Sequence, residues 1–94
     1  MSLFVVQHKH DLAACPAANP QVAPMLLKLL ASAPQQGVTI IAEAVVDGGH
    51  ELNMIVDAAA PSTVEQFMAP FAQMGSVTVR AASHCETVVD RGAC

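Results

Sequence analysis

The sequence predicts an α+β fold with the element order β-α-β-β-α-β, and three observations support this class. The chain has 94 residues, enough for one domain with a single modest core. Asp47-Gly48-Gly49 is a strong hairpin signal, and it divides a β-rich stretch at residues 38–58. Two segments with apolar residues at helical spacing flank this hairpin, each preceded by a proline.

The first strand is predicted at "LFVVQHKH", residues 3–10. Side chains of a strand alternate between its faces, so Leu3 and Val5 share one face while Phe4 and Val6 share the other. A sheet with one face in water would instead alternate apolar and polar residues. We therefore expect both faces of this sheet to be covered.

The first helix is predicted after the loop "DLAACPAA". Asn19-Pro20 resembles an N-cap followed by a proline at the first helical position, although Pro24 would move the helix start toward itself. The apolar residues at helical spacing are Val22, Leu26, Leu29 and Leu30.

The second helix is predicted to open at Pro61-Ser62, and Ser62 and Glu65 have the spacing of a capping box. Pro70 should kink or shorten this helix, and Gly75 is a natural C-cap. The last strand, "SVTVRAAS", follows at residues 76–83.

This order is the ferredoxin-like arrangement, with two helices on one face of a four-stranded antiparallel sheet. "VTIIAEAVVDGGHELNMIVDA" and "PSTVEQFMAPFAQMGSVTVRAAS" resemble small members of the dimeric α/β-barrel superfamily, including a nickel-binding type. The resemblance implies a homodimer that packs sheet to sheet, and it allows functions as different as monooxygenase and isomerase. It covers residues 1–83 as one domain and leaves 84–94 as a cysteine-containing tail.

Composition and charge exclude several classes of partner. The hydrophobic fraction of 53% is high for a short chain and favours a partner copy that hides apolar surface. With a net charge of −4 and four Lys plus Arg, neither nucleic acid nor an anionic membrane is expected as a partner. There is no apolar run of the roughly 18 residues that a membrane helix needs, and no charged region before the N-terminal apolar piece. A cytoplasmic protein with reduced thiols is the expectation.

"QHKHDLAACP" at residues 7–16 carries the main candidate site. His8 and His10 stand two residues apart on a strand, so both project on the Phe4 and Val6 side. Cys15 follows in a short loop that could supply a third ligand. A His/His/Cys set suits zinc first, then nickel or copper, and suits magnesium or calcium poorly. Two solvated histidines at a strand end are the alternative.

The tail adds His84, Cys85 and Cys94, of which the cysteines are candidates for a fourth metal ligand. The end of the last strand should neighbour the start of the first in an antiparallel pair, which would place Cys85 away from the histidines. A frayed tail is the alternative, while the β-like "ETVVD" favours docking, for example on a partner chain.

Glu43 lies within the apolar stretch "IIAEAVV". A two-residue hairpin loop would pair it with Met54, whereas a three-residue loop would place it with Glu51 and Asn53. Facing a cavity, Glu43 could join His8 as a proton-transfer pair in an enzyme for a small organic molecule. Phe4, Val6, Met54 and Ile55 would be the walls of such a cavity, located either between sheet and helices or between protomers. An ion pair with Arg80 is the other interpretation.

His50, beside the turn, is interpreted as a surface residue, or as a ligand contributed across a dimer.

Overall fold

A computed structural model describes residues 1–11, 13 and 15–94 and contains one four-stranded antiparallel sheet with the order β2-β3-β1-β4. The strands are β1 (Ser2–Lys9), β2 (Thr39–Val45), β3 (Glu51–Ala58) and β4 (Ser76–Ala82). The α-helices are α1 (Ala23–Ala31), α2 (Pro61–Phe67), α3 (Ala69–Ala72) and α4 (Cys85–Arg91), and short 3-10 turns span η2 (Pro16–Ala18) and η3 (Ala33–Gln36). The predicted fold class and the ferredoxin-like order are confirmed.

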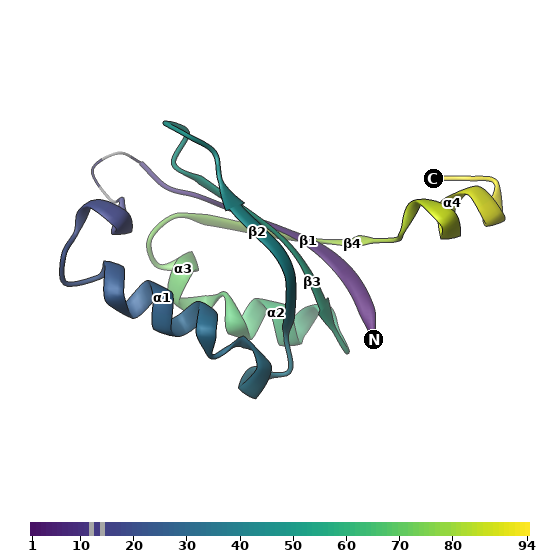
Figure 1. The fold of residues 1–94 in the computed structure, drawn as a ribbon, viewed down its shortest axis with the longest axis horizontal. Helices are drawn as coiled ribbons and strands as arrows, with labels where there is room; N and C mark the ends of the chain where they lie inside the picture. Colours follow the sequence, from purple (N-terminus) through teal and green to yellow (C-terminus); the bar gives the residue numbers. More distant parts are fainter. Residues whose placement is uncertain (12, 14) are drawn as a thin grey trace.

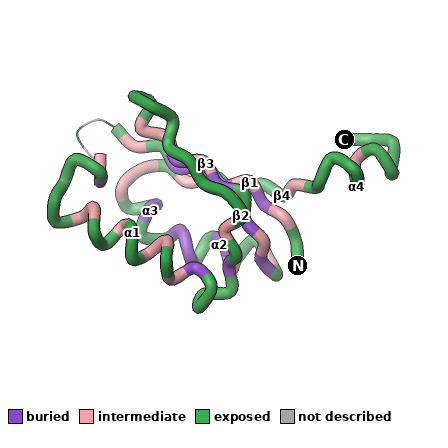
Figure 2. Tube along the Cα trace, viewed as in Figure 1, coloured by how far each residue is buried: buried purple, intermediate pink, exposed green. Residues whose placement is uncertain are grey.

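The helices α1, α2 and α3 lie on one side of the sheet, and the other side is left open (Figure 1). The core forms between these layers, where the buried parts of the sheet and of α2 and α3 meet (Figure 2). Phe4, Val6 and His8 of β1 are all buried on this side, because the strand alternation points them toward the helices. Phe67 and Phe71 fill the space beneath them. Burying an aromatic side chain of this size contributes about 2–3 kcal/mol.

The central strand β1 pairs with β3 on one side and β4 on the other. Leu3 is opposite Ala82 and Lys9 is opposite Ser76, so the end of β4 neighbours the start of β1, as predicted. At its other end, β4 begins so close to β1 that a Cβ on Gly75 would overlap the carbonyl oxygen of Lys9 and lie 3.0 Å from the Cα of His10. Gly75 is therefore required for close approach.

The helix starts differ from the sequence predictions in their caps. Asn19 accepts hydrogen bonds from the backbone N–H groups of Gln21 (2.9 Å) and Val22 (3.3 Å), so it caps a turn that precedes α1. The helix itself begins at Ala23 with Pro24 in its first turn, which confirms the prediction that Pro24 moves the helix start toward itself. The loop predicted at 11–18 contains η2, and residues 12 and 14 lie outside the described residues.

The predicted capping box of the second helix is wrong. The N-cap of α2 is Ala60, and no side-chain hydrogen bond is formed there, because the helix begins at Pro61 and places Ser62 inside its first turn. Pro70 divides the predicted helix into α2 and α3, as expected. Gly75 does not cap α3, which ends at Ala72 with Gln73 as its C-cap.

The hairpin connects β2 and β3 through residues 46–50, a loop longer than either predicted form. Glu43 nevertheless pairs with Met54, the first of the two predicted registers. A bulge between Ile40 and Ala42 shifts the register along β2. Glu43 therefore lies on the same side of the sheet as the helices.

The tail is helical, so the β-like interpretation of "ETVVD" is wrong. The helix α4 has Glu86 in its first turn and Arg91 in its last, which complements the helix dipole, and Gly92 closes it with a φ of 72°. It extends from the end of β4 away from the sheet (Figure 1). None of the helices in the described residues is both long and apolar enough to span a membrane.

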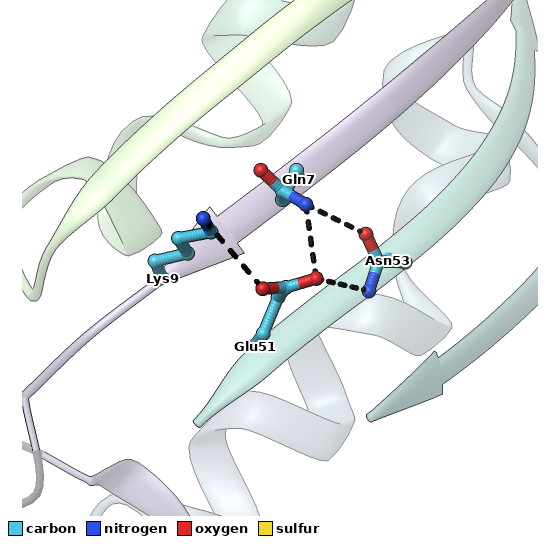
Figure 3. Close-up of polar contacts among 4 residues, drawn as sticks. All are labelled: Gln7, Lys9, Glu51 and Asn53. Carbon is cyan, nitrogen blue, oxygen red and sulfur yellow. Dashed lines mark hydrogen bonds and ion pairs between the residues drawn. The ribbon is translucent and has the colours of Figure 1, made fainter. Parts of the chain in front are cut away.

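The open side of the sheet carries a polar network at one end (Figure 3). The Gln7 amide donates to Glu51 (3.0 Å) and to the Asn53 side-chain oxygen (3.1 Å), and the Asn53 amide donates to Glu51 (3.0 Å). Lys9 lies 3.7 Å from the other Glu51 oxygen. Toward the other end, Ile55 is 40% exposed beside the half-buried Val5.

Candidate metal centre

His8 is held in one tautomer by the backbone of β4. Its side chain is only 2% exposed, and its Nδ1 lies 3.1 Å from the carbonyl oxygen of Ser76. Because a carbonyl can only accept, Nδ1 carries the proton and Nε2 keeps a lone pair. Nε2 is buried and has no hydrogen-bond partner. A backbone carbonyl that orients one ring nitrogen while the other is free is the arrangement around many metal-binding histidines.

His10 lies just beyond the end of β1, on the same side of the sheet as His8. The two rings are stacked with their centroids 5.2 Å apart. The backbone N–H of His10 donates to the carbonyl of His50 at 3.2 Å, which ties the end of β1 to the hairpin loop. Both ring nitrogens of His10 are buried without a partner. Leaving such a group unpaired costs about 1–3 kcal/mol, so a missing partner is indicated here.

His50 brings a third imidazole to this place from the hairpin loop. Its ring centroid lies 5.3 Å from that of His10, at an interplanar angle of 71°. Its φ of 50° places it in the left-handed region, and it is the one non-glycine residue there among the described positions. This conformation costs roughly 1 kcal/mol for a residue with a Cβ and is often associated with function.

Cys15 completes a compact group of donors. One ligand atom each from His10, Cys15 and His50 lies within 4.8 Å of the others. All three residues are partly buried. Tetrahedral zinc with bonds of about 2.0–2.3 Å needs donor separations of roughly 3.3–3.6 Å. Small side-chain adjustments would therefore allow all three donors to reach one ion.

The surroundings of His8 and His10 favour the neutral form of both rings. Burial lowers the pKa of His8, the nearby His10 lowers it further, and the Ser76 carbonyl raises it in part. Burial also lowers the pKa of His10, with His50 adding to the effect and Asp11 opposing it. Neutral imidazole is the form that binds a metal.

A cavity of about 330 Å³ adjoins the cluster, between α1 and the β2–β3 hairpin. His8, His10, Cys15 and His50 all line it, together with Glu43. The remaining walls are mostly apolar, and the apolar side chains come from α1, the hairpin and α3: Leu26, Leu27, Leu30, Val45, Val46, Leu52 and Phe71. This volume is at the lower end of the range for small-molecule sites.

The structure brings some predicted residues together and separates others. His10 and Cys15 share the cluster, and His8 adjoins it, as the strand alternation predicted. Cys85 and Cys94 are exposed on and after α4. Because Cys85 follows the end of β4 that pairs with the start of β1, about 20–25 Å of strand separate it from His10.

His50 is the residue that the sequence analysis did not place in the same-chain site. Asp47-Gly48-Gly49 was interpreted as a turn and His50 as a surface residue or a ligand contributed across a dimer. In the structure the five-residue loop returns His50 to His10 of the same chain.

Two other predictions about this region are wrong. Glu43 and Arg80 are on β2 and β4, the opposite edge strands of the sheet, so they cannot form a pair. Ile55 is opposite Val5 and lies on the open side, so it is no wall of a cavity between sheet and helices, and its place in a cavity between protomers stays a prediction. Phe4, Val6 and Met54 do face the helices, but they are buried in the core.

A family model described as "Domain of unknown function (DUF3303)" matches residues 2–93. The chain belongs to this family. The description assigns no activity, and a search of curated proteins finds no match. The sheet order is that of the ferredoxin-like fold, which does not by itself determine an activity.

We predict that the metal-free protein loses stability as the pH falls below 6.5, the ordinary pKa of the two histidines. Their pKa values are lowered in the folded state, so below 6.5 the unfolded chain binds more protons and the free energy of unfolding decreases. Denaturation in chelator at pH about 7.5 and about 5.5 measures this.

His8→Gln should reduce the pH dependence of unfolding, whereas His84→Gln, on the exposed tail, should leave it unchanged. An equal pH dependence of unfolding in wild type and His8→Gln would contradict the lowered pKa of His8 as its cause.

Proposed function

We propose that this protein binds one divalent transition-metal ion through His10, Cys15 and His50. Zinc is the preferred ion, followed by nickel or copper. The observation that carries the proposal is the convergence of three donor atoms, from β1, the η2 loop and the hairpin, within 4.8 Å. His10, just after β1, and Cys15 are close in sequence, whereas His50 comes from the distant hairpin, so the convergence of all three depends on the fold.

The type of donor selects the type of metal. Two imidazole nitrogens and one thiolate form a borderline-to-soft set, which favours zinc, nickel and copper over magnesium or calcium. An ion would also give a partner to one of the two buried ring nitrogens of His10. The backbone hydrogen bond from His10 to His50 already holds their two chain segments together, so only side chains need further ordering on binding.

The roles of the remaining candidates follow from their positions. His8 lies beside the centre with a free Nε2, either as a fourth ligand or as a partner for a group bound to the metal. A fourth ligand from Cys85 or Cys94 stays a prediction that would require the tail of another chain.

We predict that untagged protein holds about one zinc per chain after dialysis, measured by elemental analysis and metal titration. His10→Asn and His50→Asn should each reduce bound zinc to less than about a tenth of an equivalent. With both proteins metal-free, the His50 substitution should leave thermal stability unchanged or raise it, because Asn tolerates the left-handed conformation. Metal uptake should release protons and weaken in acid.

His84→Asn is the matched control, since this histidine is exposed on the tail, and the double variant Cys85→Ser/Cys94→Ser should also retain zinc. Wild-type protein without zinc, or full occupancy in His50→Asn, would refute the proposal.

We also infer that a second copy of the chain covers the open side of the sheet. Leu3, Val5 and Ile55 are apolar there, and the partly exposed Ile55 lies near the middle of the sheet. The polar network of Gln7, Glu51 and Asn53 beside this patch could form the rim of an interface.

Sedimentation equilibrium at micromolar concentration should then give twice the 9.8 kDa of one chain. Ile55→Asp should shift the mass to that of a monomer, because it buries a charge in the contact, whereas Met25→Asp on the outer side of α1 should not. A wild-type mass of 9.8 kDa would exclude the dimer.

A further inference from the structure

We propose that the metal centre binds the head group of a small amphiphilic molecule, whose apolar body fills the cavity between α1 and the β2–β3 hairpin. The head group would carry an anionic oxygen and a neighbouring N–H or O–H, as in a hydroxamate or a 2-hydroxy acid. This inference rests on the proposed metal binding.

The coordination number leaves a position for such a head group. His10, Cys15 and His50 supply three donors, whereas zinc in proteins takes four. All three residues line the cavity, so the fourth position of a bound ion is accessible from it. Three protein ligands and one open position are the arrangement of zinc sites that bind exchangeable groups.

Charge favours an anionic oxygen at the open position. A divalent ion with one thiolate and two neutral imidazoles keeps a net charge of about +1. The cavity is lined mostly by apolar residues, in which an uncompensated charge is costly. One singly charged oxygen ligand would neutralise the ion with its three ligands, because Glu43 lines the cavity but is not among the donor atoms that converge there.

One hydrogen-bond acceptor beside the centre and a second acceptor in the cavity wall favour a donor in the same head group. The Nε2 atom of His8 carries a lone pair because Nδ1 donates to Ser76, and it is buried without a partner. The carboxylate residue Glu43 lines the same cavity. A simple carboxylate would offer these groups only acceptors, whereas a hydroxamate or 2-hydroxy acid also donates a hydrogen.

The walls of the cavity define the body of the molecule. Leu27 is 68% exposed and Val45 is 59% exposed, although both line the cavity, so an apolar body would cover surface that now faces water. Leu52 and Phe71 form deeper, buried parts of the wall. At about 30 Å³ for each water-sized group, 330 Å³ holds roughly ten non-hydrogen atoms.

The test uses full-length, untagged, zinc-loaded protein and three probes: octanohydroxamic acid, acetohydroxamic acid and octanamide. Titration calorimetry should show that octanohydroxamic acid binds at least about 100-fold more tightly than acetohydroxamic acid, because its longer chain fills the cavity. Octanamide, which lacks the metal-binding group, should bind zinc-loaded protein at least about 100-fold more weakly than octanohydroxamic acid does. Metal-free protein should bind octanohydroxamic acid at least about 100-fold more weakly than zinc-loaded protein does.

A pair of variants on α1 tests the cavity itself. Leu27→Glu should weaken octanohydroxamic acid at least about 10-fold while zinc stays bound, because it places a charge in the apolar wall. Met25→Glu is the matched control, since Met25 is similarly exposed on the same helix but does not line the cavity. It should leave the affinity unchanged.

Three results would overturn the inference while leaving metal binding intact. Equal affinities for the long and short hydroxamates would show that the cavity does not contribute. Failure of both to bind would show that the centre is already closed, for example by His8 as a fourth ligand. Removal of zinc by the probes would show that no stable complex with the centre forms. Protein that takes up no zinc would instead refute the proposed function, and the inference with it.

Discussion

The pairing of β1 with β3 and β4 determines where the polar groups of the site can lie. Successive side chains of β1 point to opposite faces of the sheet, and β1 has a neighbouring strand on each side. Phe4, Val6 and His8 therefore all point into the layer between sheet and helices. The same alternation places His10 on this side of the sheet, just beyond the end of β1. The close contact of Gly75 with Lys9 and His10 then holds this end of β1 against β4. A slip of one residue would turn both histidines to the opposite side of the sheet.

The candidate centre combines groups that are unfavourable without a ligand. The buried nitrogens of His10 are unpaired, His50 has a left-handed backbone, and apolar residues around the cavity are exposed. Each of these costs free energy of the order of 1–3 kcal/mol. A bound ion would offset the cost at His10, and an apolar molecule would offset the exposure of the apolar residues. The left-handed backbone of His50 is the conformation that directs its ring toward His10.

Local sequence patterns predicted most of the fold, because the spacing of apolar residues indicates strands and helices and glycines indicate turns. The alternation of β1 gave the common side of His8 and His10, and the glycines after Asp47 marked the hairpin. Contacts between segments far apart in the chain could not be predicted from these local patterns. The position of His50 depends on the length of the loop at 46–50, and the side that Glu43 faces depends on the register past a bulge. In the tail, helix-end signals at Glu86, Arg91 and Gly92 outweighed the β propensity of two valines.

X-ray absorption at the metal edge of untagged, zinc-loaded protein tests the central claim most directly, because it counts the atoms bound to the ion. The account predicts about two nitrogen neighbours near 2.0–2.1 Å and one sulfur neighbour near 2.3 Å, with imidazole scattering beyond them. In Cys15→Ser protein, the sulfur contribution should disappear. A shell of oxygen atoms alone, or a sulfur signal that persists in Cys15→Ser, would contradict a centre formed by His10, Cys15 and His50.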